Sequence, residues 1–202
     1  QRWKQLSASD RFTFADYAGF IVANPGFPDE AKLRAYAERA LEREAVSPER
    51  IAAYFDRVPP LGNFARAQYA LALFALNRPE ANEVGLAAWR GGAMSDVSEA
   101  YLFPKLGPVL TLADHDAQMN ALLWASNAIQ ADRLLRFTSP ALQPLFAARI
   151  GLAKSIDPLA AGLSLPPGTE RDPGYVFNRV RWLRTSGQWD AAAQLLATRP
   201  PL

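Results

Sequence analysis

The helical spacing of apolar residues is the feature that most constrains the fold of this 202-residue chain. Between residues 63 and 76 apolar side chains recur at intervals of three and four positions, as in Phe64, Ala67, Leu71 and Phe74. Runs that alternate apolar and polar residues, rich in Val, Ile and Thr, are missing, and so are Asn-Gly and Asp-Gly hairpin turns. We therefore predict an all-α fold, with this segment buried on most sides.

Residue pairs that favour helix starts recur along the chain. A Ser or Asp precedes Pro at residues 47, 139, 157 and 172, which combines a capping oxygen with a residue that has no N–H to satisfy. Thr111 and Asp114 have the spacing of a capping box. Together with the periodicity, these pairs predict helices over residues 10–23, 29–45, 48–56, 63–76, 80–90, 96–106, 112–125, 128–136, 140–153, 173–186 and 189–197.

A pattern of a leucine, a turn residue and an alanine occurs three times in the chain. Within each pattern the three residues are four positions apart. The leucines are Leu73, Leu123 and Leu183. The turn residues, which can end a helix in the left-handed conformation, are Asn77, Asn127 and Gly187, and the alanines are Ala81, Ala131 and Ala191. Helix–turn–helix units cannot bury their apolar faces alone, so they stack. The repeat therefore predicts an α-solenoid without a sheet.

The composition excludes several kinds of site. The chain has no cysteine and one histidine, which excludes disulfides, iron–sulfur clusters and cysteine-based zinc sites and disfavours multi-histidine metal sites. Its 22 basic and 20 acidic residues give a net charge of +2, which is too balanced to indicate a nucleic-acid-binding protein. The longest apolar run, Tyr69–Leu76, is too short to span a membrane. We predict no metal, no cofactor, no nucleic-acid partner and no transmembrane segment.

The titratable residues are best interpreted as structural. His115 lies between Asp114 and Asp116 in the first turn of a predicted helix, where adjacent side chains point in different directions. Glu38 and Glu42 lie one turn apart, as do Glu80 and Glu83. Each pair is on a predicted helix rich in Arg or Ala, where charge pairing at i,i+4 explains the carboxylates. No pattern places a carboxylate in an apolar pocket that would raise its pKa. We predict no catalytic residue in this chain.

The second half of the chain holds the candidate binding residues. Residues 117–202 contain nine basic and five acidic residues, a local charge of +4. Arginines three positions apart share a helix face, and such a face would suit an anionic polymer, although a solvated surface is the alternative. The candidate substrate-binding residues are Arg133, Arg136, Arg149, Arg181 and Arg184. Trp124, Trp182 and Trp189 accompany the repeat, so we expect them to pack between helices.

Short stretches of residues 14–199, taken in order, resemble the N-terminal superhelical domain of the soluble lytic murein transglycosylases of Gram-negative bacteria. In the first half the resemblance is carried by Asn24-Pro25-Gly26-Phe27-Pro28, Leu33-Arg34, Ala37-Glu38, Ile51 to Phe55, Pro59-Pro60, Tyr69-Ala70, Ala72-Leu73, Glu80-Ala81 and Ala88-Trp89. In the second half it is carried by Leu110-Thr111, Asp114-His115, Leu122-Leu123-Trp124, Ala148-Arg149, Asp172-Pro173-Gly174, Arg181-Trp182-Leu183-Arg184 and Gly187. Gln118 and Asn120 depart from the family, which commonly has Arg and Asp there.

This resemblance implies a fold, an activity and a location. It implies that residues 1–202 form a single non-catalytic domain, an all-α, right-handed superhelix of stacked helix pairs. The parent enzyme would cleave the glycan strands of peptidoglycan in the periplasm, after removal of a signal peptide. In that family, a Glu in a Glu-Ser motif of a C-terminal lysozyme-like domain acts as general acid and then base, which leaves anhydromuramic ends.

The catalytic part of that family has no counterpart in this sequence. None of its nine glutamates precedes a serine, so we expect the lysozyme-like domain to be absent from this chain. We also expect the native polypeptide to continue beyond Arg199–Leu202, because no polar capping helix is visible there. The implied partners are the glycan strands, the catalytic domain of the parent enzyme and other cell-wall enzymes.

Two other functions stay open. The chain could be a stand-alone α-solenoid that binds a protein or peptide, or a complete small enzyme that uses His115. A downstream reading frame with a Glu-Ser motif would favour the transglycosylase scaffold, whereas a stop codon would favour the stand-alone module.

Overall fold

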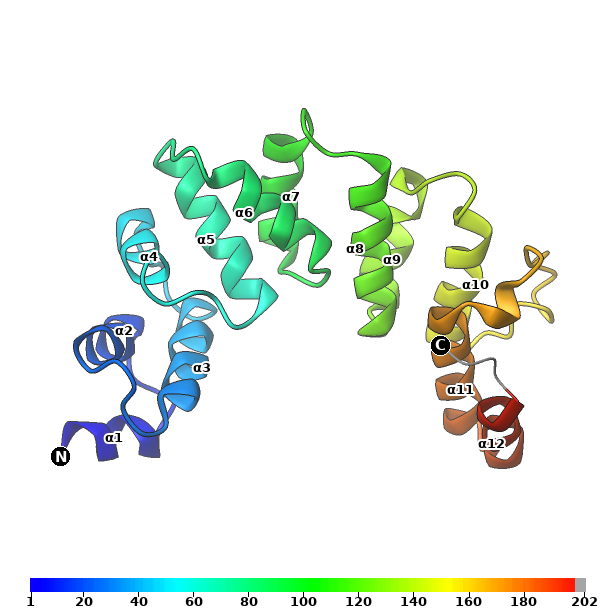
Figure 1. Cartoon of the computed structure of the whole chain (residues 1–202), viewed down its shortest axis with the longest axis horizontal. Helices are drawn as coiled ribbons and strands as arrows, with labels where there is room; N and C mark the ends of the chain where they lie inside the picture. The colour runs from blue at the N-terminus through cyan, green and yellow to red at the C-terminus, as the bar shows by residue number, and fades with distance from the viewer. Residues whose placement is uncertain (199–202) are drawn as a thin grey trace. The chain divides into compact units, whose positions relative to one another are not determined.

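The chain is helical throughout the part that its computed structural model describes, residues 1–198, and this part contains no strand (Figure 1). The prediction of an all-α fold is therefore confirmed, whereas the prediction about Arg199–Leu202 lies outside the described residues. The α-helices are α1 (Arg2–Ala8), α2 (Phe14–Ala23), α3 (Glu30–Leu41), α4 (Pro48–Phe55), α5 (Asn63–Ala75), α6 (Ala81–Arg90), α7 (Asp96–Leu106), α8 (Leu112–Trp124), α9 (Ala128–Leu134), α10 (Gln143–Ala153), α11 (Pro173–Thr185) and α12 (Trp189–Thr198). Two short 3-10 helices are η1 (Leu135–Phe137) and η2 (Thr169–Arg171).

The helices form two compact units. Unit 1 comprises Gln1–Trp89 and Met94–Val109, and unit 2 comprises Arg90–Ala93 and the chain from Leu110 onward. Unit 1 thus contains α1 to α7, apart from the last residue of α6, and unit 2 contains α8 to α12. The single domain and the right-handed superhelix stay predictions.

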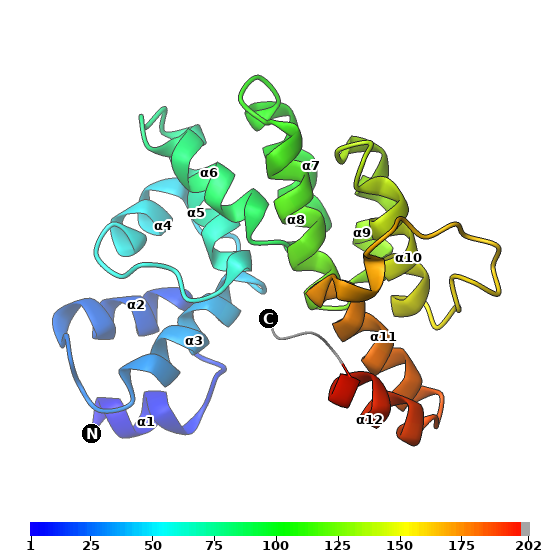
Figure 2. The same ribbon diagram turned by 45° about the vertical axis from the view of Figure 1, so that its right-hand side comes forward.

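Aromatic rings fill the core of unit 1. Helix α2 packs against α3, and α4 packs against α5 (Figure 2). The ring of Phe14 meets that of Tyr54 edge to face, with centroids 5.3 Å apart, and Tyr17 meets Tyr36 in the same way at 5.7 Å. Edge-to-face contacts of this kind bury large apolar areas and add a preferred geometry.

Unit 2 has a mainly aliphatic core. Helices α8, α9 and α10 enclose one buried cluster, formed by Met119, Leu122, Leu123, Ala131, Leu134, Phe146 and Ile150. A second cluster joins α10 to α11 through Ala148, Leu152 and Tyr175, with Trp182 packed against it. Helix α5, in unit 1, is buried on most sides, as its sequence predicts.

Local capping explains where several helices begin. Thr111 and Asp114 form the predicted capping box at α8, and the side chain of Asp172 accepts a hydrogen bond from the Tyr175 N–H at α11. A second capping box, between Thr13 and Asp16, starts α2 at residue 14 instead of the predicted residue 10. Ser47 occupies the N-cap position of α4, with Pro48 as the first helical residue.

Other predicted starts are wrong. Ser139 does not cap a helix, because its N–H and hydroxyl both donate to the Asp116 carboxylate, and α10 begins only at Gln143. Asp157 accepts a hydrogen bond from the Leu159 N–H within a turn, and no helix follows. Helix α1 is not predicted from the sequence, because it buries only Leu6 and therefore has little apolar periodicity.

The repeated turns are real, although one is shifted. Asn77 and Gly187 have positive φ angles of 53° and 79°, and the following N–H in each case bonds to the carbonyl of the predicted leucine. In the middle repeat Ser126, not Asn127, adopts the left-handed conformation, and the Asn127 N–H bonds to Leu122. Two of the three predicted alanines are buried, whereas at α12 the buried residue is Ala192 rather than Ala191.

Candidate binding surface

A buried hydrogen-bond network joins three helices of unit 2. The Arg149 guanidinium on α10 donates to Asn178 Oδ1 on α11 at 2.8 Å and to Asn120 Oδ1 on α8 at 2.7 Å. Asn178 also donates from Nδ2 to the Leu123 carbonyl near the end of α8, at 2.9 Å. Because hydrogen bonds are directional, this network fixes how α8, α10 and α11 lie against one another.

Arg149 is therefore an interior residue. It is 1% exposed, and burial lowers its pKa to about 10, an effect that the nearby Asp172 carboxylate opposes. Gly174 permits this placement, because a Cβ there would lie within 2.5 Å of Arg149 Nη1 and Nη2. The prediction that Arg149 lies on a basic face for a polymer is therefore wrong. Its guanidinium instead joins α10 to α8 and α11 through hydrogen bonds.

The network brings an exposed tryptophan against α11. Trp124 is the last residue of α8, directly after Leu123, and its ring lies 4.6 Å from that of Phe177, centroid to centroid. Phe177 precedes Asn178, so the hydrogen bond that docks Asn178 on α8 also sets the position of this ring pair. Trp124 nonetheless remains 43% exposed, which leaves much of its indole open to solvent.

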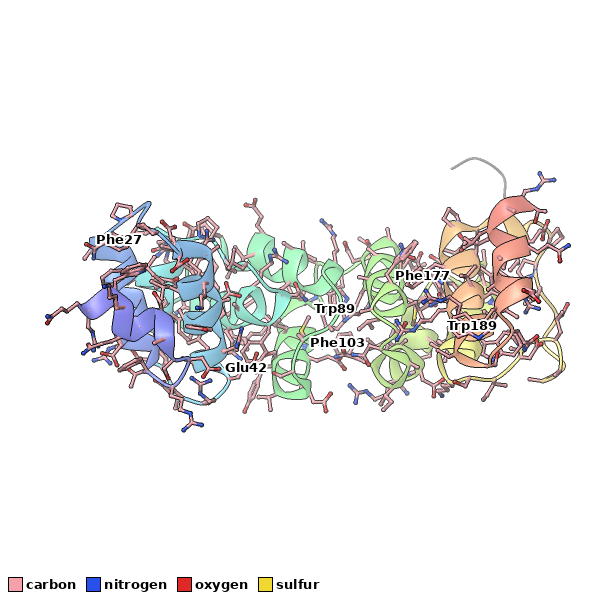
Figure 3. All side chains as sticks on the ribbon, turned by 90° about the horizontal axis from the view of Figure 1, so that it is seen from below. Phe27, Glu42, Trp89, Phe103, Phe177 and Trp189 are labelled. Carbon is pink, nitrogen blue, oxygen red and sulfur yellow. The ribbon has the colours of Figure 1, made fainter. Side chains whose placement is uncertain are left out.

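The same face of α11 carries two of the predicted arginines. Phe177, Arg181 and Arg184 are spaced by four and three residues, which places them in a row on one side of a helix. The Arg184 guanidinium lies 5.7 Å from the ring centroid of Trp189, and that tryptophan is 61% exposed. Figure 3 labels Phe177 on α11 and Trp189 at the start of α12. We call the set Trp124, Phe177, Arg181, Arg184 and Trp189 the aromatic–arginine strip.

Arg133 and Arg136 lie on other elements of unit 2. Both are exposed, Arg133 on α9 and Arg136 on η1. The Arg136 guanidinium stacks over Phe137 at 4.7 Å, and the Phe137 ring in turn stacks on His115. The predicted set of five arginines is thus divided: Arg181 and Arg184 share the strip, Arg133 and Arg136 lie on α9 and η1, and Arg149 is buried.

Core packing is the wrong prediction for two of the three repeat tryptophans. Trp182 does pack against the second cluster of unit 2, as expected. Trp124 and Trp189 lie at helix ends, where the core face has already been completed by Leu122 and Leu123 in α8 and by Ala192 in α12. The sequence places both tryptophans beside the turn of a predicted helix hairpin, and this position could have predicted that they are exposed.

Asp114, His115 and Asp116 each contact different neighbours, as predicted from their adjacent positions on a helix. Asp114 accepts hydrogen bonds from Thr111 and forms an ion pair with Arg90, with Arg90 Nε 2.6 Å from Asp114 Oδ1. Burial raises the pKa of Asp114, but these hydrogen bonds outweigh it and the net pKa is lowered. Burial lowers the pKa of His115, while Asp116 binds Ser139. These contacts account for each side chain locally, without a shared site.

One member of each glutamate pair has a specific partner in unit 1. Glu38 on α3 accepts hydrogen bonds from the Leu61 and Gly62 N–H groups, just before α5 begins. Glu80 pairs with Arg78 at 3.0 Å. Within residues 1–198 no group of three or more His, Asp or Glu side chains is arranged to hold a metal ion, and no helix there is long and apolar enough to cross a bilayer.

Comparison with protein-family models, curated proteins and solved structures gives no match to this chain.

Proposed function

We propose that this chain is a non-catalytic scaffold of a peptidoglycan lytic transglycosylase, and that the aromatic–arginine strip retains the glycan. The observation that carries the proposal is the row of Phe177, Arg181 and Arg184 on one face of α11. The exposed indole of Trp124 contacts Phe177, and the exposed indole of Trp189 contacts Arg184. The order of the motifs that resemble the transglycosylase family supports the choice of substrate.

The chemistry of the strip suits a peptidoglycan strand. A pyranose ring presents a face of C–H groups that packs on an aromatic ring, and an exposed indole offers a large flat surface with a polar N–H. The stem peptides carry carboxylates, which planar guanidinium groups bind through paired hydrogen bonds. Phe177 and Arg184 are seven residues apart, so the strip extends for about 10 Å along α11, long enough for consecutive sugar rings.

The remaining parts of this proposal follow from the family. The parent enzyme would act in the periplasm, with its general acid and base in a lysozyme-like domain that this chain would help to position. The chain alone would then bind murein and release no anhydromuropeptides. Other cell-wall enzymes are further candidate partners.

The direct test is co-sedimentation of residues 1–202 with purified murein sacculi. We expect binding by the natural chain, a loss of about tenfold or more in Trp124→Ala/Trp189→Ala, and a smaller loss in Arg181→Ala/Arg184→Ala that disappears at high salt. Tyr101→Ala, which removes an exposed aromatic ring from unit 1, is the matched control and should bind normally.

Two further measurements separate the parts of the proposal. Sacculi stripped of stem peptides by an amidase should still bind through the indoles but lose their sensitivity to the arginine variants. Release of anhydromuropeptides by the chain alone would show that it is itself an enzyme. Equal binding by the natural chain and the tryptophan variant would exclude the strip as the glycan contact.

A further inference from the structure

An apolar groove lies between α2 and α4 in unit 1, far along the sequence from the aromatic–arginine strip. Its volume is about 580 Å³. The floor on the α2 side is formed by small and apolar residues on one helix face, Ala15, Ala18, Gly19 and Val22, and α4 contributes Ala53 and Tyr54. Phe14, Ala18 and Tyr54 line the groove and also belong to the buried core, so the groove adjoins the core face of both helices. Ala15, Gly19 and Val22 extend the apolar surface of α2 beyond that face.

The rim of the groove is positively charged. Arg50 lines it from α4 and Arg57 from the turn that follows α4, and no acidic residue is among its lining residues. Neither guanidinium forms a hydrogen bond or ion pair within residues 1–198. Most other arginines of unit 1 do have acidic or carbonyl partners, as Arg39 does with Asp10 and Arg78 with Asp56. Two unpartnered cations beside an apolar floor match a ligand that is apolar on one side and anionic at its edges.

The dimensions of the groove favour a helix as that ligand. The lining residues of α2 run from Phe14 to Ala23, which corresponds to about 13 Å of helix, or two and a half turns. Arg50 lies in the first turn of α4 and Arg57 lies two residues beyond its last residue, Phe55, so a partner helix laid along α4 would meet these two cations with acidic residues on one of its faces. A fatty acid carries a single carboxylate and would leave one arginine unpaired.

From these features we infer that the α2–α4 groove binds an amphipathic helix of a partner protein, with its apolar face on Ala15, Gly19 and Val22 and acidic residues against Arg50 and Arg57. Helices that dock this way place an apolar side chain on the groove at every turn. Gly19 is the best position at which to test the groove. A Cβ built there would have no atom within 4 Å, so the space above it is open to the partner helix. The inference does not depend on the proposed glycan binding.

The test uses a fluorescent 15-residue helical peptide with a Leu and Ala face and Glu at two positions seven residues apart. We expect saturable binding to residues 1–202. Gly19→Leu should reduce the affinity at least tenfold, because the new side chain occupies the groove. The same substitution should not lower the melting temperature, since leucine is a better helix former than glycine and has room there. Ala100→Leu, at an exposed position of α7, is the matched control.

Charge reversal provides the second arm. Arg50→Glu/Arg57→Glu should weaken the Glu peptide about tenfold and should bind a peptide with Lys at those two positions more tightly than the natural chain does. Lys4→Glu/Arg11→Glu, with the same net charge, should leave both affinities unchanged.

Several outcomes would overturn the inference. These are failure of the Glu peptide to bind at millimolar concentration, equal binding of the Glu and Lys peptides by the natural chain, or full affinity in Gly19→Leu. Displacement of the peptide by laurate with higher affinity than the peptide itself would assign the groove to a small amphiphile. Concentration-dependent dimerisation that Gly19→Leu abolishes would assign it to a second copy of this chain.

Discussion

Units 1 and 2 are both built from packed helices, but different forces position the helices in each. In unit 1 aromatic rings from α2, α3 and α4 meet edge to face, and the contacts are apolar. In unit 2 the positions of α8, α10 and α11 depend on a buried arginine and two asparagines. Apolar contacts tolerate a change of shape if volume is kept, whereas a hydrogen-bond network fails when one member is lost. Substitutions in the two units should therefore differ in their cost to stability.

The largest effect is expected for Arg149→Ala. The change leaves a cavity and removes the partner of Asn178, which is itself buried, so we expect a loss of about 3–5 kcal/mol in the free energy of unfolding. We expect the two compact units to unfold separately, so hydrogen exchange should locate the loss of protection in α8, α10 and α11, with unit 1 unaffected. Arg149→Met fills most of that cavity, so it should lower the free energy of unfolding by less than Arg149→Ala does. A cost below about 1 kcal/mol for Arg149→Ala would contradict this role for the network.

The second prediction concerns Asp114, the buried carboxylate at the start of α8. Its folded pKa is lowered overall, because the hydrogen bonds from Thr111 and Arg90 outweigh the effect of burial, so its contribution to stability is present above pH 4 and is lost as the pH falls through the folded pKa. Asp114→Asn should cost about 1–2 kcal/mol at pH 7 and progressively less toward pH 3. Urea unfolding across this range is the measurement. Asp190→Asn, which removes an exposed carboxylate from the first turn of α12, is the matched control.

The third prediction tests the tolerance of unit 1. Phe14→Leu keeps an apolar side chain in the core and loses the edge-to-face contact with Tyr54, so we expect a cost of only about 1 kcal/mol. Thermal unfolding of this variant should be cooperative, with protection in α2 and α4 retained. A cost as large as that of Arg149→Ala would show that ring geometry in unit 1 is as demanding as the network in unit 2.

The smallest effect is expected for Tyr54→Phe. Tyr54 is 3% exposed, and its hydroxyl has no hydrogen-bond partner within residues 1–198. Burial raises the pKa of this hydroxyl. Removing it should leave stability unchanged or raise it by up to about 1 kcal/mol. Tyr17→Phe is the control, because the Tyr17 hydroxyl donates to the Ser9 carbonyl and its loss should cost about 1 kcal/mol. Both changes are measured by urea unfolding.

Residues that act within one turn of helix were predictable. Thr111 and Asp114 bond to each other, and Asp172 caps a helix three residues away, so sequence spacing contains the whole interaction. Asn77 and Gly187 likewise end helices through local bonds. Ser126 was missed because a left-handed serine is costly and its neighbour Asn127 is the better former of that conformation.

Residues whose role depends on a distant partner were not predictable. Ser139 has the local features of a helix cap. Its N–H and hydroxyl both donate to Asp116, however, which lies 23 residues earlier in the chain. Arg149 has the sequence features of an exposed base, but Asn120 and Asn178, each 29 residues away, hold it in the interior. In the candidate site, the arginine pair of α11 was identified from its spacing, whereas Trp124 and Phe177 meet only because α8 and α11 pack together.

By itself the sequence determined that this protein is helical, where most of its helices lie, and how several of them end. It could do so because helical periodicity and capping involve residues at most a few positions apart. The tertiary structure alone decided which arginine is buried, which tryptophans reach solvent and which helix faces stay open as the strip and the groove. Periodicity defines an apolar face, but only the packing of other helices determines whether that face is covered.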